Sequence, residues 1–218
     1  MHDIATRLRL AMQPGNPLPA PSFAPGLSYG RHRGPARHDA RIAAVALTLF
    51  QNEADDWMIP LTLRPTTLQH HGGQVCLPGG RVEPGEAPRD AALREFEEEL
   101  GVRPNVTQHC GELATQYVYA SNNLVHPIVA VIDRPHDSWQ PDPVEVAEVI
   151  TLPLVSLINR EGRCEVALRR EVRQQGDSVG EMVFRAPAFR YGSHAVWGAT
   201  ALILDQLARI LHSEGVSL

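Results

Sequence analysis

Cysteine, long apolar runs and excess charge are all scarce in this sequence, and each scarcity excludes a class of protein. The cysteines are Cys76, Cys110 and Cys164, an odd number without a CxxC pair, which argues against a disulfide framework and predicts reduced thiols. The longest apolar-rich run, residues 42–50, is too short to cross a bilayer. Since the N-terminus also lacks the apolar stretch of a secretory signal, we expect a soluble, cytoplasmic protein.

Neither sign of charge dominates the chain. A formal net charge of −5 over 218 residues gives no reason to expect binding to nucleic acid or to an acidic membrane surface. The hydrophobic fraction of 43% is ordinary for a globular protein. The length predicts one domain with extensions, long enough to bury a sizeable core.

Prolines set the N-terminal region apart. Residues 2–12 are compatible with a short helix, and five prolines in residues 13–26 exclude regular structure there. We therefore interpret residues 1–38 as a proline-rich arm that wraps the domain or a partner, with no core-forming pattern in its proline segment, and residues 39–218 as the folded domain. The arm ends in a basic stretch, residues 31–41, which is either a solvated linker, the interpretation we favour, or a contact for a phosphorylated ligand.

The domain alternates strand and helix patterns. Residues 42–50 and 57–64 predict a hairpin, and a glycine-rich segment, residues 70–86, separates it from a helix over residues 88–100. Pro88 suits the first turn of that helix, and Gly101 suits its end. Further strands, a second hairpin and a C-terminal amphipathic helix over residues 194–215 follow. This mixture predicts an α+β or α/β sandwich.

The helix over residues 88–100 carries four glutamates within five positions, where like charges repel. At about 100° per residue, Glu95, Glu98 and Glu99 share one sector of the helix, whereas Glu97 points elsewhere. The cluster is either an inert solvated face or a site for a positive charge. Three converging carboxylates suit a hard divalent cation such as Mg²⁺ or Mn²⁺.

The residues around this cluster follow a longer pattern. Gly80 is followed after five residues by Glu86 and after seven more by Arg94-Glu95-Phe96, and the segment continues to Val102. This spacing resembles the Nudix box, GX₅EX₇REUXEEXGU with U an apolar residue, at every defined position.

The resemblance implies a Nudix hydrolase, a pyrophosphohydrolase with a mixed sheet sandwiched between helices that cleaves a nucleoside diphosphate linked to another group. It also implies that Glu95, Glu98 and Glu99, with the backbone carbonyl of Gly80, bind Mg²⁺ or Mn²⁺. Arg94 would orient a glutamate, and Glu86 would support the geometry of loop and helix. The expected partner is a small-molecule nucleotide, and a homodimer stays open.

Members of this family often draw one more acid from outside the box. The segment over residues 141–154 offers Glu145 and Glu148 as metal ligand or general base. The alternative is that both are exposed glutamates without a role, and spacing alone does not decide between them. We expect Glu145 to join Arg94 and Glu98 in catalysis.

Residues 60–80 resemble the coenzyme A pyrophosphatase branch of the family. Matching positions include Arg64, Gly79 and Gly80, which we expect to bind substrate, whereas Gln69 replaces an arginine that would bind a phosphate. The resemblance implies hydrolysis of coenzyme A or its derivatives to 3′,5′-ADP and 4′-phosphopantetheine. The alternatives are a hydrolase for ADP-ribose or another nucleoside diphosphate derivative, and a non-catalytic nucleotide-binding module.

Overall fold

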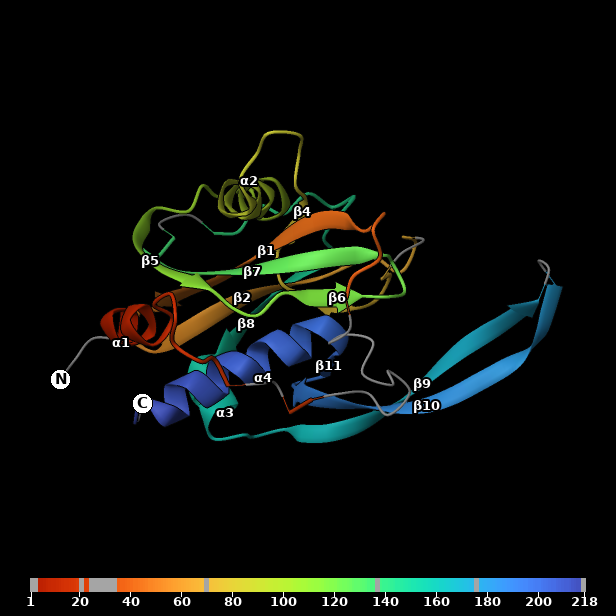
Figure 1. Ribbon diagram of the computed structural model, residues 1–218. Coiled ribbons are helices and arrows are strands. Elements are labelled where there is room, and N and C mark those ends of the chain that lie inside the picture. The colour runs from red at the N-terminus through yellow and green to blue at the C-terminus, as the bar shows by residue number, and fades with distance from the viewer. Residues whose placement is uncertain are drawn as a thin grey trace.

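The computed structural model describes residues 4–19, 22–23, 35–68, 71–135, 138–174 and 177–216. A mixed sheet lies between helix α2 on one face and helices α1, α3 and α4 on the other, and a long hairpin extends from one end of this body (Figure 1). The helices are α1 (Ile4–Ala11), α2 (Pro88–Leu100), α3 (Leu154–Ile158) and α4 (Gly198–Ser213). The predicted sandwich with a mixed sheet is confirmed.

The main sheet is built around two long parallel strands, β1 (Arg41–Gln51) and β7 (Asn123–Ile132). Its strand order is β3-β2-β1-β7-β5, and all its other pairings are antiparallel. The remaining strands of this sheet are β2 (Trp57–Leu63), β3 (Val75–Cys76), β4 (Gly79–Arg81), β5 (Val106–Glu112), β6 (Gln116–Val118) and β8 (Glu148–Pro153). Because β4 and β7 both pair with β1, the segment that contains Gly79 and Gly80, the glycine loop, is held at the centre of the sheet.

Strand β1 is mostly apolar between its polar ends, because both of its faces are buried over residues 46–50. Ala46 and Phe50 pack in the cluster under α2. Leu47 and Leu49 pack in the larger cluster that contains α4. Side chains that alternate between two cores explain why residues 42–50 show a run of apolar residues and no alternation with polar ones.

Helix α2 begins and ends where the sequence predicts. Pro88 occupies the first turn, and Gly101 takes a left-handed conformation with φ of 67° and donates its N–H to the Glu97 carbonyl at 2.8 Å. A Cβ on Gly101 would lie 2.0 Å from the carbonyl oxygen of Gln140. Both the turn and the neighbouring loop therefore require glycine.

The C-terminal segment differs in part from its prediction. Residues His194–Trp197 form strand β11, which pairs with β10, and helix α4 starts only at Gly198. The predicted second hairpin is confirmed as β9 (Arg163–Gln174) and β10 (Asp177–Tyr191), which pair antiparallel. Helix formation at residues 194–197 fails because these residues complete a three-stranded sheet with the hairpin.

The N-terminal arm packs against the domain, and the expectation that its proline segment lacks core-forming residues is wrong at Phe23. Helix α1 forms as predicted and buries Ile4 and Leu8, and Phe23 is buried farther along the arm. A helix with apolar residues four apart buries one face against a neighbour even when prolines follow it. Of the basic stretch, Arg31 and Arg33 lie outside the described residues. A domain boundary at residue 38 stays a prediction.

Within the part of the chain that the structure describes, no helix combines the length and the apolar character needed to cross a membrane.

Candidate active site

The glycine loop and helix α2 meet at very short range. An added Cβ on Gly80 would lie 2.3 Å from the carboxyl carbon of Glu95, and one on Gly79 would lie 2.3 Å from the carbonyl oxygen of Ala44. A side chain at position 79 would collide with the backbone of β1, and one at position 80 would displace the carboxylate of Glu95. Gly79 therefore lets β4 lie directly against β1, and Gly80 lets the carboxylate of Glu95 lie directly against the β4 backbone.

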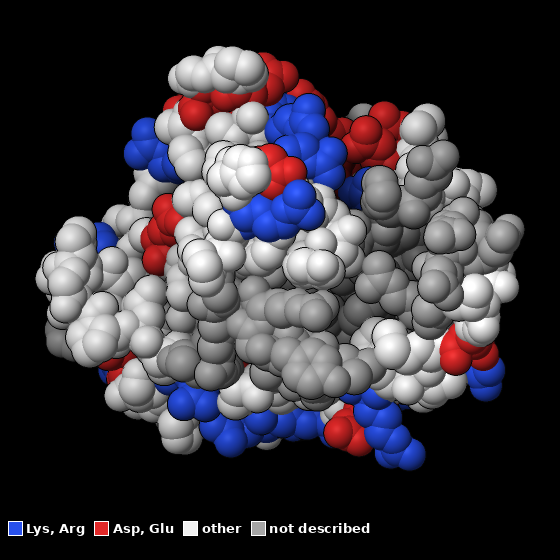
Figure 2. Space-filling view, turned by 45° about the vertical axis from the view of Figure 1, so that its right-hand side comes forward, with Lys and Arg blue, Asp and Glu red and all other residues white. Residues whose placement is uncertain are grey.

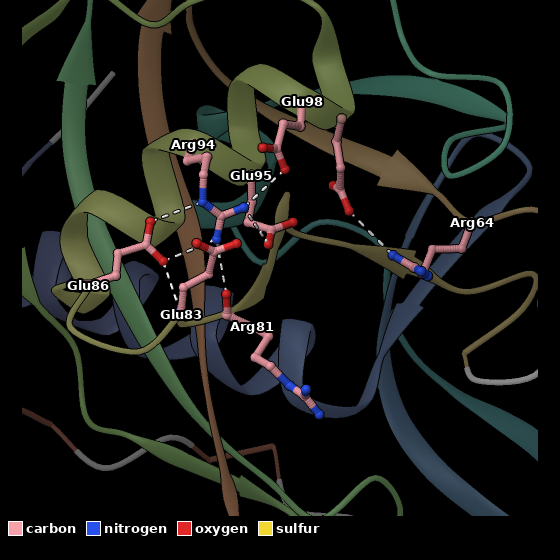
Figure 3. Close-up of polar contacts among 8 residues, drawn as sticks. Arg64, Arg81, Glu83, Glu86, Arg94, Glu95 and Glu98 are labelled. Carbon is pink, nitrogen blue, oxygen red and sulfur yellow. Dashed lines mark hydrogen bonds and ion pairs between the residues drawn. The ribbon is translucent and has the colours of Figure 1, made fainter.

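Arg94 connects the loop to the helix through five hydrogen bonds (Figure 3). Its guanidinium donates to both carboxylate oxygens of Glu86, at 2.9 and 3.1 Å, and to the carbonyl of Arg81 at 3.0 Å. It also donates to Glu95 at 2.9 Å and to Glu98 at 3.0 Å. The hydrogen bonds from Arg94 lower the pKa of Glu86, so this carboxylate stays ionised and ties the loop to the helix.

Glu99 is the most deeply buried of the four glutamates, with 1% of its surface exposed. Its Oε1 accepts a hydrogen bond from Nη1 of Arg64 at 3.3 Å, which is the dashed line that leaves Arg64 in Figure 3. Its Oε2 is buried and has no hydrogen-bond partner among the described residues. Burial raises the pKa of Glu99 to about 8, although the charge of Arg64 acts in the opposite direction.

The remaining glutamates occupy the positions that the helical periodicity predicts. Burial raises the pKa of Glu95, which lies beside the glycine loop. The side chain of Glu98 is 56% exposed and lies on the same face. Glu97 points away from this face and lies 4.0 Å from Arg103 on the surface. Figure 2 shows acidic and arginine side chains next to one another in the upper part of the molecule, at the level of α2 in Figure 1.

Of the two further acids, Glu145 is the one that lies near the cluster. Its negative charge raises the pKa of both Glu95 and Glu99. Glu148, on β8, instead pairs with His194 at 3.3 Å.

The backbone of the loop that carries Glu145 is bound to the end of α2, a contact that sequence reasoning missed. The N–H of Gln140 donates to the Leu100 carbonyl at 2.9 Å, and that of Asp142 donates to the Glu99 carbonyl at 3.3 Å. The last carbonyls of a helix lack partners within the helix. These carbonyls predict that another segment donates hydrogen bonds to the end of α2, but they do not identify the segment.

Cys76 is a second neighbour of the site that the sequence did not indicate. Its thiol lies close enough to Arg64 and Glu99 for their charges to affect it, and burial raises its pKa to about 11. Cys76 is therefore a neutral thiol at physiological pH and not a nucleophile.

This face of α2 suits a hard divalent cation. In the conformation described, Arg94 and Arg64 bind the carboxylates, and no group of three or more His, Cys, Asp or Glu side chains with metal-site spacing occurs among the described residues. The carboxylates nevertheless supply only oxygen ligands, which Mg²⁺ and Mn²⁺ prefer. Glu98 is exposed enough to turn, and the unpartnered Oε2 of Glu99 is a buried acceptor that a cation would satisfy.

Known proteins share this region. The model of the NUDIX domain matches residues 40–163, more than half of the chain. The chloroplastic Nudix hydrolase 22 of Arabidopsis thaliana is 31% identical over 198 residues, which cover 86% of this chain and 61% of that protein. The mitochondrial coenzyme A diphosphatase NUDT8 of Homo sapiens is 31% identical over 152 residues, which cover 69% of this chain and 61% of that protein.

The chain thus spans less than two thirds of the length of either relative. A crystal structure of a MutT/nudix family protein from Enterococcus faecalis is 16% identical and covers 85% of this chain and 68% of that one, with a TM-score of 0.49. The residues that the NUDIX domain matches contain the glycine loop, the glutamate cluster and Glu145. The chain belongs to the Nudix family.

Proposed function

We propose that this protein is a metal-dependent pyrophosphohydrolase that cleaves the diphosphate of a nucleoside diphosphate derivative. The observation that carries the proposal is the buried Glu99, whose Oε2 has no partner among the described residues, on the same helix face as Glu95 and Glu98. A buried carboxylate oxygen without a partner is costly unless a ligand satisfies it. A cation at this point would offset that cost.

Glu95, Glu98 and Glu99, with the carbonyl of Gly80, would hold Mg²⁺ or Mn²⁺. When bound, such an ion neutralises phosphate oxygens and lowers the pKa of a water molecule. Arg94 keeps Glu95 and Glu98 aligned, because it binds both while it is fixed to Glu86 and to the β4 backbone.

In this proposal Glu145 would accept the proton of the attacking water. Its charge acts on both Glu95 and Glu99 although it is not on α2, which supports this role. In the reaction, the water oxygen bonds to one phosphorus atom while the bond from that phosphorus to the bridging oxygen breaks. Glu98, which is more exposed than Glu95 or Glu99, is the alternative proton acceptor, and the two are distinguished by Glu145→Gln and Glu98→Gln pH–rate profiles.

The substrate that we propose is coenzyme A or one of its derivatives, with 3′,5′-ADP and 4′-phosphopantetheine as products. The match of residues 60–80 to the coenzyme A branch and the similarity to a human coenzyme A diphosphatase support it. The chain contains no lysine, so all 20 of its permanently charged cationic side chains are arginines. A permanently charged side chain that contacts the phosphates is therefore an arginine, and we propose Arg64 for this role. The backbone of Gly79 and Gly80 would add further contacts. Gln69, which departs from the branch pattern, lies outside the described residues.

A hydrolysis screen with Mg²⁺ or Mn²⁺ tests both levels of this proposal. We expect turnover of coenzyme A, with a preference for coenzyme A over its 3′-dephospho form. If Arg64 binds the 3′-phosphate, Arg64→Ala should erase that preference, at a cost of about 1.5–3 kcal/mol for one charged hydrogen-bond partner. If Arg64 binds the diphosphate, which both forms share, Arg64→Ala should slow the turnover of both forms equally. Equal turnover of both forms, or preferred turnover of ADP-ribose, would contradict the substrate. No turnover of any diphosphate would favour a nucleotide-binding module without catalysis.

A further inference from the structure

Arg64 contacts the deepest carboxylate of the site, and its contacts differ from those of Arg94. We propose that Arg64 is an internal counter-cation that a divalent ion displaces from Glu99, so that ion binding releases the guanidinium to bind the diphosphate. This inference rests on the proposed function, because it assumes that the glutamate cluster binds such an ion. It makes Arg64 the residue that couples the binding of ion and anion.

Two hydrogen bonds fix the backbone of Arg64, whereas its guanidinium makes a single hydrogen bond among the described residues. Arg64 follows directly after β2, its N–H donates to the Gln74 carbonyl at 3.0 Å, and its own carbonyl accepts from the Gly73 N–H at 3.0 Å. By contrast, the guanidinium makes one hydrogen bond among the described residues, the 3.3 Å bond to Glu99. Since 25% of the side chain is exposed, the head can leave Glu99 for solvent without moving the strand.

The electrostatics favour an exchange of cations. A buried carboxylate is expensive to leave unpaired, so Arg64 stabilises Glu99 when no other positive charge is near. The neighbouring negative charges, on Glu95 of the cluster and on Glu145 of the adjoining loop, attract any cation to this point. A divalent ion bound to Glu99 carries twice the charge of a guanidinium and would repel it at such short range.

The displaced guanidinium can still bind an anion at the site, because the backbone of Arg64 stays bonded to Gly73 and Gln74, in the segment that leads to the glycine loop. Displacement would leave an arginine with five unpaired donors at the edge of a metal site, where the oxygens of a diphosphate would lie. The ion should then raise the affinity for the anion through Arg64, and by linkage the anion should raise the affinity for the ion by the same factor. Arg94 is unsuited to this exchange because five hydrogen bonds hold it.

The first test measures Mn²⁺ binding without substrate, by the electron paramagnetic resonance signal of free Mn²⁺ at neutral pH. We compare wild type with Arg64→Gln and with the control Arg103→Gln, which removes an arginine that lies beyond the end of α2 and pairs with Glu97 on the far side of that helix. We expect Arg64→Gln to bind Mn²⁺ about fivefold more tightly or better, which is the lower range of typical coupling, and the control to match wild type.

Unchanged or weaker Mn²⁺ binding in Arg64→Gln would overturn the inference, since Arg64 would then be irrelevant to the ion or would position Glu99 for it. Absence of Mn²⁺ binding in wild type and in both variants would overturn the proposed function itself, and this inference with it. The two failures are therefore distinguishable without any measurement of activity.

The second test follows the Nε–H resonance of Arg64 by NMR during titration with Mg²⁺ and then with inorganic phosphate as the probe anion. We expect the Arg64 resonance to shift with the midpoint of Mg²⁺ binding while that of Arg103 does not. Phosphate should then bind more tightly with Mg²⁺ present, and Arg64→Gln should lose most of this gain. An Arg64 resonance that Mg²⁺ leaves unchanged, or an undiminished gain in Arg64→Gln, would overturn the exchange.

Discussion

Glu99 of α2 and Asp205 of α4 are both buried carboxylates that pair with an arginine, yet their oxygen atoms are used differently. Asp205 is fully buried, and its Oδ2 accepts hydrogen bonds from the N–H of Ser22 at 2.5 Å and from its hydroxyl at 2.8 Å. Its Oδ1 accepts from Arg163. Glu99 accepts a 3.3 Å bond from Arg64, the backbone N–H of Gly79 also acts on its carboxylate, and its Oε2 has no partner within hydrogen-bond distance among the described residues.

The surroundings of the two arginines differ in the same sense. Arg163 lies over the ring of Phe23, 4.5 Å from its centroid, and Phe23 stacks on Phe189 at 4.6 Å. Asp205 and Arg163 thereby fasten the arm to α4, and their bonds are fixed by packing. Arg64 has no such support in the described residues. This difference agrees with the roles that we propose: Asp205, whose oxygens are satisfied, holds the arm, whereas Glu99, which is left partly unsatisfied, binds a cation.

The largest effect that follows concerns activity. Glu99→Gln keeps the shape of the side chain but removes its charge, so hydrolysis should fall by more than about 100-fold, since even outer partners of metal ligands are worth 10–100-fold. The measurement is kcat/KM with Mg²⁺ and the diphosphate that the screen identifies. Glu97→Gln, on the opposite side of the helix, is the matched control and should retain activity. Equal losses in both variants would contradict the assignment of faces on α2.

The corresponding change at Asp205 should affect stability and not the site. Asp205→Ala leaves Arg163 without its buried partner, and breaking a buried pair typically costs about 3–5 kcal/mol of the free energy of unfolding. We expect the low end of that range because Arg163 is partly exposed. Urea unfolding measures the change, with Glu99→Gln as the control that should lose no stability. A similar loss in both variants would show that the two carboxylates have the same role.

The site was more predictable from the sequence than the contact between arm and core. Glu95, Glu98 and Glu99 follow from helical geometry within one segment, and the glycine loop is adjacent to that segment in the chain. The bonds of Ser22 to Asp205 join residues 183 positions apart, and no local pattern specifies such a pairing. The choice between Glu145 and Glu148 also depended on tertiary structure, because the two differ in which neighbour they face.

The pH dependence of stability should separate the two carboxylates further. The pKa of Glu99 rises from 4.5 to about 8 on folding, so between these values the folded chain binds more protons than the unfolded chain at this residue. The contribution of Glu99 to the free energy of unfolding is therefore fully present below pH 4.5, and it is lost as the pH rises from there through about 8. Between pH 6.5 and 8, wild type should lose about 1.5 kcal/mol relative to Glu99→Gln, which has no titrating group there.

The measurement is urea unfolding of both proteins across this pH range in the presence of a chelator, because a bound cation would keep Glu99 ionised. Parallel curves for wild type and Glu99→Gln would contradict the raised pKa. A loss of wild-type stability relative to Glu99→Gln that grows as the pH falls would contradict the direction of the pKa shift.

The smallest effect tests how fully Asp205 is satisfied. Ser22→Ala removes the hydroxyl bond to Oδ2 but keeps the backbone N–H bond and the pair with Arg163. Since Asp205 retains a partner on each oxygen, the loss should be about 0.5–1.5 kcal/mol, the value of one ordinary hydrogen bond. Urea unfolding of Ser22→Ala, Asp205→Ala and the double variant measures it. In the double variant Ser22→Ala should cost almost nothing, because its partner is already gone. If Ser22→Ala alone cost as much as Asp205→Ala, the hydroxyl and not Arg163 would be the main partner of this carboxylate.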